Sequence, residues 1–364
     1  MNRTSIILAI SMLLFCCIAC EDEDELSPSG LDTDRVQDLL DWSNPVVKKY
    51  YRDYGVALMT DFDENLDIKF NFYESWANSF WKKMEIGKME RKSECDSAIT
   101  VLDTAVFRYF KDELEFQGEV YHSDFKKKYF PNKILITNKL IVGSDVSGLI
   151  MQTVNRPSKT GVGSTFCQSN DNAIVVNLES GMLNISPEKF EQVTKAILYV
   201  MIVYAFDKYD LYSMVPDAFY EFSKPYYGKR IYQLQEEAGE EKSHAVARSE
   251  WVETYHMIAT SVAPTDNMNG MLAESSIPDA RRDVCICIDH LINPETIDGA
   301  RVETENAPFV YQLSPQCSIK MWYIAQTLIK LGIDVMAISP DPNFRKFIST
   351  RTQEDIDDLT NNLL

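Results

Sequence analysis

The chain has 364 residues and a formal net charge of −19, from 55 acidic and 36 basic residues. Nucleic acids and anionic membrane surfaces are bound by positively charged surfaces, so we expect neither as a partner of so acidic a protein. The length is sufficient for a sizeable hydrophobic core without disulfides or metals to reinforce it.

The first residues have the features of a secretory signal. Arg3 precedes an apolar run, Ile6 to Ala19, that is shorter than the about 20 residues needed to span a bilayer. Cys20 follows Ala19 directly and resembles the lipidated cysteine of a bacterial lipobox, although Cys17 stands where that motif more often has leucine. We therefore predict a lipoprotein signal over residues 1–19 and lipidation of Cys20.

Residues 20–33 are predicted to form an acidic tether. Five consecutive acidic residues follow Cys20, and Ser27-Pro28-Ser29-Gly30 comes next, so almost nothing here can be buried. An acidic run after the lipobox cysteine resembles the surface-export signal of Bacteroidetes-type lipoproteins. We expect attachment to the outer membrane through the lipid and exposure at the cell surface; the alternative is a plain secretory signal with a solvated linker.

The part of the chain that follows the tether reads as helix, then strands, then a mostly helical stretch. It begins with a predicted helix over 34–42 and a second helix starting at Pro45. Two strands over 56–62 and 66–72 follow, and residues 75–115 are predicted to be mostly helical. Two further strands are predicted, one over 133–137 that extends to 142 and one over 173–178. Within 75–115, an apolar stripe at helical spacing is expected to pack a core; it consists of Ile99, Leu102, Val106, Phe107 and Phe110.

The clearest helix is predicted from Ser186 to Phe206. Ser186 suits the cap, Pro187 the first turn and Glu188 the positive end of the helix dipole. Its second half is apolar on all sides, which is typical of a buried helix. Further helices are predicted over 249–262, 318–331 and 353–363. We therefore predict one α+β domain over 34–364, with a sheet half (34–185), the buried helix, and a helical half (186–364).

Five cysteines remain after the signal and the lipidated residue: Cys95, Cys167, Cys285, Cys287 and Cys317. An odd number cannot pair completely within one chain. Cys285 and Cys287 would share a face if their segment were a strand, and could then meet a partner such as Cys317. Buried thiols are the favoured interpretation.

Several stretches resemble one family in their order along the chain. They are Leu40-Asp41-Trp42, Tyr54-Gly55-Val56, Asp61-Phe62-Asp63, Phe130 to Ile136, Asn172 to Asn177, Ser318 to Tyr323 and Gly332 to Val335. The family comprises Bacteroidetes lipoproteins known as zinc-binding metallopeptidases, or substrate-import-associated zinc metallohydrolases. The resemblance implies a zincin-like fold and an association with an outer-membrane nutrient importer.

The family's zinc motif is missing from the predicted buried helix. In H-E-x-x-H, two histidines one turn apart hold zinc and the glutamate polarises a zinc-bound water. At the equivalent positions this chain has Lys195, Ala196 and Tyr199. A lysine ammonium has no lone pair for a metal and alanine transfers no proton. Since no histidine lies between His122 and His244, a shifted register does not restore the motif, and we predict no cofactor.

One alternative metal site remains in the sequence. Glu253 and His256 are three residues apart and would share a helix face, and Glu250 lies one turn before Glu253. These three residues would hold a displaced zinc ion, whereas the ordinary interpretation is a pair of surface acids beside a capping or core histidine.

The sequence therefore predicts a surface lipoprotein that resembles zinc metallohydrolases but has lost their catalytic helix. Its expected role is to bind a peptide or glycan, as an accessory of outer-membrane import, between the sheet edge and the helix bearing Lys195 and Tyr199. Lys195 would contact a ligand carboxylate or form an i, i+4 pair with Glu191. The alternatives are an active peptidase-like enzyme with the displaced metal site, and a purely structural surface protein.

Overall fold

The computed structural model describes residues 34–69, 84–142, 167–169, 173–178, 187–240, 254–258, 277–294 and 314–364. The predicted signal, Cys20 and the tether lie outside these residues. The chain divides into two units between Leu40 and Asp41. In the first unit, α2 (Arg35–Leu39) begins where the Asp34 carboxylate accepts a hydrogen bond from the Val36 amide at 3.0 Å, which satisfies one of the free amides at the helix start.

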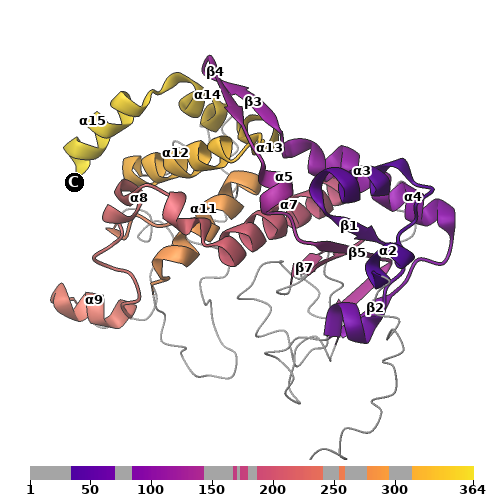
Figure 1. The fold of residues 1–364 in the computed structure, drawn as a ribbon. Helices are drawn as coiled ribbons and strands as arrows, with labels where there is room; N and C mark the ends of the chain where they lie inside the picture. Colours follow the sequence, from indigo (N-terminus) through magenta and orange to yellow (C-terminus); the bar gives the residue numbers. More distant parts are fainter. Residues whose placement is uncertain are drawn as a thin grey trace, which may run out of the picture. The chain divides into compact units, whose positions relative to one another are not determined.

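The main sheet of the second unit has the strand order β1-β5-β8-β7. The strands β1 (Ala57–Met59), β5 (Lys133–Thr137) and β8 (Ala173–Asn177) are parallel, and β7 (Cys167–Ser169) is antiparallel to β8 at one edge (Figure 1). The central strands are buried, and their residues Ile134 to Ile136 and Ala173 to Val176 form uninterrupted apolar runs, as is typical of parallel strands covered on both faces. The predicted strands 133–137 and 173–178 are confirmed.

The predicted continuation of β5 to residue 142 is wrong. The chain leaves the main sheet at Asn138, and β6 (Lys139–Val142) pairs instead with β2 (Met84–Gly87) in a separate antiparallel ribbon. The Asn138 side chain donates to the carbonyl of Lys88 at 2.7 Å, which fixes the corner. Glycine is required opposite it, because a Cβ at Gly87 would collide with the Asn138 side chain.

The predicted strand over 66–72 is also not observed where it is described. Residues Glu64–Lys69 form a helical turn of the π type, η1. The turn starts because the Asp63 carboxylate accepts hydrogen bonds from the amides of Asn65 and Leu66, at 2.8 and 2.9 Å. Local capping therefore overrides the alternation of apolar residues from which a strand was inferred.

Helices surround this sheet in the N-terminal half. They are α3 (Pro45–Tyr54), α4 (Lys92–Val101) with the turns η3 (Leu102–Val106) and η4 (Phe107–Tyr109), and α5 (Phe125–Lys128). All five residues of the predicted apolar stripe are buried. Phe107 and Phe110 pack edge-on or tilted against Phe130, with ring centroids 5.4 and 4.9 Å apart, so the stripe and the loop before β5 form one aromatic core.

A hairpin links the two halves. Its strands, β3 (Glu113–Phe116) and β4 (Glu119–His122), are joined by Gln117 and Gly118, both with positive φ, as a tight hairpin turn requires. The Gln117 side-chain amide donates to the carbonyls of Ile348, Ser349 and Arg351 at 3.0 to 3.1 Å. The hairpin tip thus satisfies carbonyl groups at the end of α14 (Pro342–Thr350).

The central helix α7 (Pro187–Tyr209) confirms the predicted buried helix, and every described side chain from Ile197 to Phe206 is buried. Its neighbours include β7 and α11 (Ala280–Ile292). In the helical half, α12 (Pro315–Lys330) is surrounded by other helices (Figure 1). Those that pack against it are α8 (Asp217–Glu221), α11, α13 (Val335–Ile338), α14 and α15 (Gln353–Leu363). The predicted helices 318–331 and 353–363 are confirmed, as is the mixed architecture with its sheets in the N-terminal half.

Candidate functional site

The α7 positions that replace the zinc motif have ordinary helix contacts. The Lys195 ammonium lies 2.6 Å from the Glu191 carboxylate one turn earlier, as the i, i+4 interpretation predicted. Tyr199 is 4% exposed, and burial raises the pKa of its hydroxyl, with further contributions from Cys285 and Asp289. Ala196 is half-buried. Tyr199 therefore packs in the core and cannot contact a ligand in the predicted binding cleft.

The alternative metal site is only partly described. Glu250 and Glu253 lie outside the described residues. His256 lies within them, and it is not helical: its φ is +53°, and residues 256–258 have no regular structure. The predicted helix over 249–262 is therefore wrong in this stretch.

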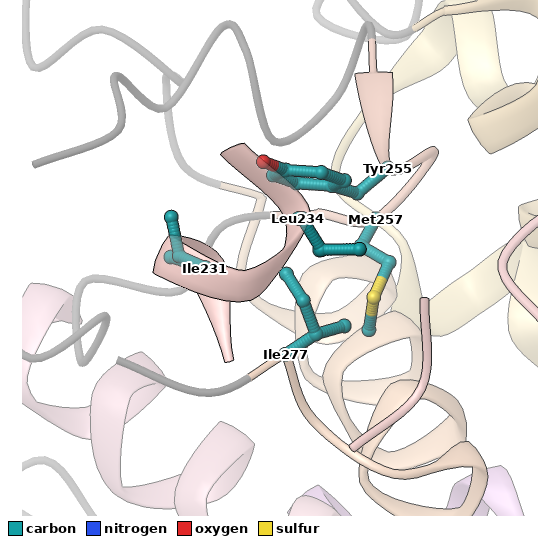
Figure 2. Close-up of a cluster of buried hydrophobic side chains, with 5 residues drawn as sticks. All are labelled: Ile231, Leu234, Tyr255, Met257 and Ile277. Carbon is teal, nitrogen blue, oxygen red and sulfur yellow. The ribbon is translucent and has the colours of Figure 1, made fainter. Parts of the chain in front are cut away.

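A hydrophobic cluster holds the side chains on either side of His256. Tyr255 and Met257, two residues apart, both enter the cluster with Ile231, Leu234 and Ile277 (Figure 2). Residues two apart on a regular helix point in different directions, so burial of both side chains in one cluster does not fit a helix here. The intervening His256 packs its ring near Phe222, at a centroid distance of 6.4 Å.

A second contact fixes this segment by its backbone. The carbonyl of His256 accepts hydrogen bonds from the Lys320 ammonium at 2.9 Å and from the Ser223 hydroxyl at 3.1 Å. Lys320 also donates to Ser223 Oγ at 2.8 Å and to Asp283 Oδ2 at 2.5 Å. Lys320 and Asp283, with side chains 1% and 0% exposed, form a buried ion pair between α12 and α11.

The buried pair is fully hydrogen-bonded on its cationic side. Lys320 has three donors and three acceptors, and its ammonium lies 4.9 Å from the Phe219 ring centroid. Tyr227 donates to the same Asp283 oxygen at 2.6 Å. Burial lowers the pKa of Lys320, but the Asp283 carboxylate, together with Cys287 and Cys317, offsets this, so the pKa is raised and the ammonium stays charged.

Two thiols lie near this pair. Cys287 Sγ is 4.0 Å from Asp283 Oδ1, and burial raises its pKa well above the usual range; burial also raises the pKa of Cys317 to about 11. A thiolate is the nucleophilic form of cysteine, so both groups are unreactive at neutral pH. The five cysteines that the structure describes are all thiols without a disulfide, as favoured from the sequence; Cys95 is half-buried and the rest are buried. Cys285 and Cys287 lie on a helix, so the strand interpretation of this segment is wrong.

Sequence reasoning missed this cluster, although a signal was present. Lys320 lies next to the apolar run Met321 to Ala325 of a buried helix, and a charge in such a stretch needs a partner. The enclosed pair has no access for a substrate. Its role is structural: it connects α11, α12 and the segment 254–258.

A half-exposed site lies at the C-terminal end of α7. The Tyr212 hydroxyl is 2.5 Å from Asp207 Oδ1 and 3.3 Å from Cys285 Sγ. Arg281 lies over the Tyr212 ring, 5.0 Å from its centroid, and pairs with Asp210 at 2.8 Å. Burial, helped by Cys285 and Asp207, raises the pKa of Tyr212, so this hydroxyl remains a donor and not a base.

A surface pocket of about 360 Å³ lies where α3, β3, β4 and α5 meet. Its lining residues are Asp53, Tyr54, Asp112, His122, Ser123, Asp124 and Lys127. The Asp112 carboxylate is held at Oδ2 by the Tyr54 hydroxyl at 2.9 Å and by the Lys126 ammonium at 3.0 Å. Burial, together with this hydrogen bond to Asp112, raises the pKa of Tyr54 to about 12, so its hydroxyl stays protonated.

Comparison with protein-family models, curated proteins and solved structures finds no match to this chain. Within the described ranges, no three His, Cys, Asp or Glu side chains are grouped so as to hold a metal ion. Among the helices of those ranges, none combines the length and apolar character needed to cross a bilayer.

Proposed function

We propose that this chain is a lipid-anchored protein of the outer-membrane surface that binds a ligand for nutrient import without hydrolysing it. The lipobox at Cys20 and the acidic tether support the location. The scaffold proposed for binding is zincin-like: a mainly parallel sheet with one antiparallel edge strand, followed by a long buried helix.

The contacts of α7 carry the non-catalytic part of this proposal. In the family that the sequence resembles, this helix supplies two zinc ligands and a general base. Here Lys195 is engaged by Glu191, Ala196 has no functional group and Tyr199 is enclosed in the core. None of these side chains can polarise a water or accept a proton from it at neutral pH.

An extended peptide is the ligand class that we favour. Among the described strands, β7 lies at the edge of the sheet and packs against α7, and an edge strand can bind a peptide through backbone hydrogen bonds. Lys195, whose side chain is 19% exposed, lies on the helix beside this edge and would contact an acidic residue or a C-terminal carboxylate.

The test uses the protein from residue 21 onward and a library of random peptides. Mass spectrometry after incubation reports cleavage, and enrichment on immobilised protein reports binding. We expect enrichment of a peptide class without cleavage, and weaker binding of acidic members by Lys195→Ala. Cleavage at defined sequences would contradict the proposal, as would the absence of any enriched peptide.

The location is tested in living cells. Incorporation of a clickable fatty acid should label the full chain and should be lost in Cys20→Ser, and protease added to intact cells should degrade the wild-type protein. Labelling that persists in Cys20→Ser, or protection from the protease, would contradict the anchored surface location.

A further inference from the structure

The pocket between α3, the β3–β4 hairpin and α5 has a charge pattern that the proposed function does not use. Three of its lining carboxylates belong to Asp53, Asp112 and Asp124, and Lys127 supplies a cation. Which of these charges are already neutralised decides what the pocket can bind.

Two of the carboxylates are engaged within the protein. Asp124 pairs with Lys128 at 3.1 Å. Asp112 accepts both of its side-chain hydrogen bonds, from Tyr54 and Lys126, at Oδ2. Lys126 is almost enclosed, with a side chain 10% exposed, and lies 4.6 Å from the Tyr54 ring centroid, so it fixes Asp112 from within the fold.

The remaining charges have opposite signs. Within the ranges that the structure describes, Asp53 and Lys127 have no ion pair or hydrogen bond through their side chains, and neither does Asp112 Oδ1. An ammonium would pair with Asp53 and donate to Asp112 Oδ1, and a carboxylate would pair with Lys127. A ligand with one charge alone would leave Asp53 or Lys127 unpaired.

The size of the pocket limits the ligand. A water molecule takes about 30 Å³ in the liquid, so a cavity of about 360 Å³ holds a molecule of roughly a dozen such units. A dipeptide fits into this volume, and a single amino acid fits with room to spare.

We propose that the Asp53–Lys127 pocket binds a small zwitterion with a free ammonium and a free carboxylate, such as an amino acid or a dipeptide. The ammonium lies against Asp53 and Asp112 Oδ1, and the carboxylate against Lys127. Tyr54 and Lys126 are positioning residues, because they hold the Asp112 carboxylate without being needed at the ligand. The pocket shares no residue with α7 or β7, so this site is separate from the proposed peptide cleft.

The experiment titrates the protein from residue 21 onward with three probes, followed by NMR chemical shifts. The probes are dialanine, its C-terminal amide and its N-acetyl derivative, so that one charge at a time is removed. Because the groups are partly solvated, we expect dialanine to bind with a dissociation constant of about 0.1–1 mM, and each blocked probe to bind about tenfold more weakly.

Variants assign the binding to this pocket. Asp53→Asn and Lys127→Gln should each weaken dialanine binding about five- to tenfold, since each removes one charge-assisted contact. Glu90→Gln and Lys346→Gln remove exposed charges outside the pocket and should leave the affinity unchanged. All four positions are exposed, so the variants should fold, which circular dichroism checks.

Three results would overturn the proposal: no shift changes with dialanine up to about 10 mM, equal affinity for all three probes, or unchanged affinity in both pocket variants. Binding of a longer peptide that survives in Asp53→Asn would show that the peptide cleft is independent. The experiments can therefore reject the zwitterion pocket without rejecting the peptide cleft, and the reverse.

Discussion

Lys320 and Asp283 lie 37 positions apart in the sequence, and their side chains meet at 2.5 Å with both charges buried. Taking two charges out of water is costly, and the cost is offset here because Ser223, Tyr227 and the His256 carbonyl complete the hydrogen bonding. The pair therefore fixes which surfaces of α11 and α12 meet, and where the segment 254–258 docks on them.

Removing one partner of this pair should be strongly destabilising. Lys320→Met leaves the Asp283 carboxylate buried without its cation, and we expect a loss of about 3–5 kcal/mol in the free energy of unfolding, measured in urea. Lys330→Met is the matched control, because Lys330 is exposed on the same helix, and it should cost less than about 0.5 kcal/mol.

The double variant Lys320→Met/Asp283→Leu tests the same mechanism in reverse. Replacing both charges by apolar groups removes the unpaired carboxylate, so we expect most of the lost stability to return. A double variant as unstable as Lys320→Met alone would show that the cost comes from packing and not from the orphaned charge.

Stability should fall at alkaline pH. Burial raises the pKa values of Cys285 and Cys317 from 9.0 to about 11 in the folded protein. The unfolded chain releases these protons first, so the stabilisation is complete below about pH 9 and is lost as pH rises through about 11. Cys317→Ala should reduce the slope of stability against pH in this window by about 1.4 kcal/mol per pH unit. An unchanged slope would contradict the assignment.

Thiol reactivity should separate Cys95 from the other cysteines. In the native protein from residue 21 onward at pH 8, we expect only Cys95 to react quickly with Ellman's reagent, because the others are buried. All five thiols should react in guanidinium. Cys95→Ser is the control and should abolish the fast phase; a second fast thiol in the native state would contradict the buried arrangement.

The hairpin tip should contribute to the stability of α14. Gln117→Ala removes the donors to three carbonyls while keeping a side chain at positive φ, and we expect a loss of about 1–3 kcal/mol, measured by urea unfolding. Gln117→Asn adopts positive φ easily but has a shorter side chain that cannot reach the carbonyls in the same way. It therefore separates the effect of backbone strain from the effect of the lost hydrogen bonds. If Gln117→Asn is as stable as the wild type, backbone strain and not the carbonyl contacts determines the effect.

The parts of the fold that the sequence predicted are those in which local pattern and tertiary contacts agree. The apolar strands around Leu135 and Val175 are stable only when buried. Gly332, just after the end of α12, has the positive φ that glycine adopts easily and that ends a helix. The i, i+4 contact of Lys195 with Glu191 was also predictable, because it depends only on helix geometry.

The errors arose where contacts between distant segments decide the conformation. The apolar residues around His256 have helical spacing, but two tertiary contacts prevent a helix there. Tyr255 and Met257 are buried in the hydrophobic cluster, and the Lys320 ammonium binds the His256 carbonyl. Neither contact can be seen within a local window. The Asp53–Lys127 pocket was missed for the same reason, since α3, the hairpin and α5 contribute to it from separate parts of the chain.

Zinc stoichiometry distinguishes a binding protein from a metal-dependent hydrolase. We predict that the protein from residue 21 onward, purified without chelators and saturated with zinc before desalting, retains far less than one zinc per chain by elemental mass spectrometry. His256→Ala should give the same low value. One tightly held zinc per chain that disappears in His256→Ala would contradict the account, because it would establish a displaced metal site and restore the enzyme interpretation.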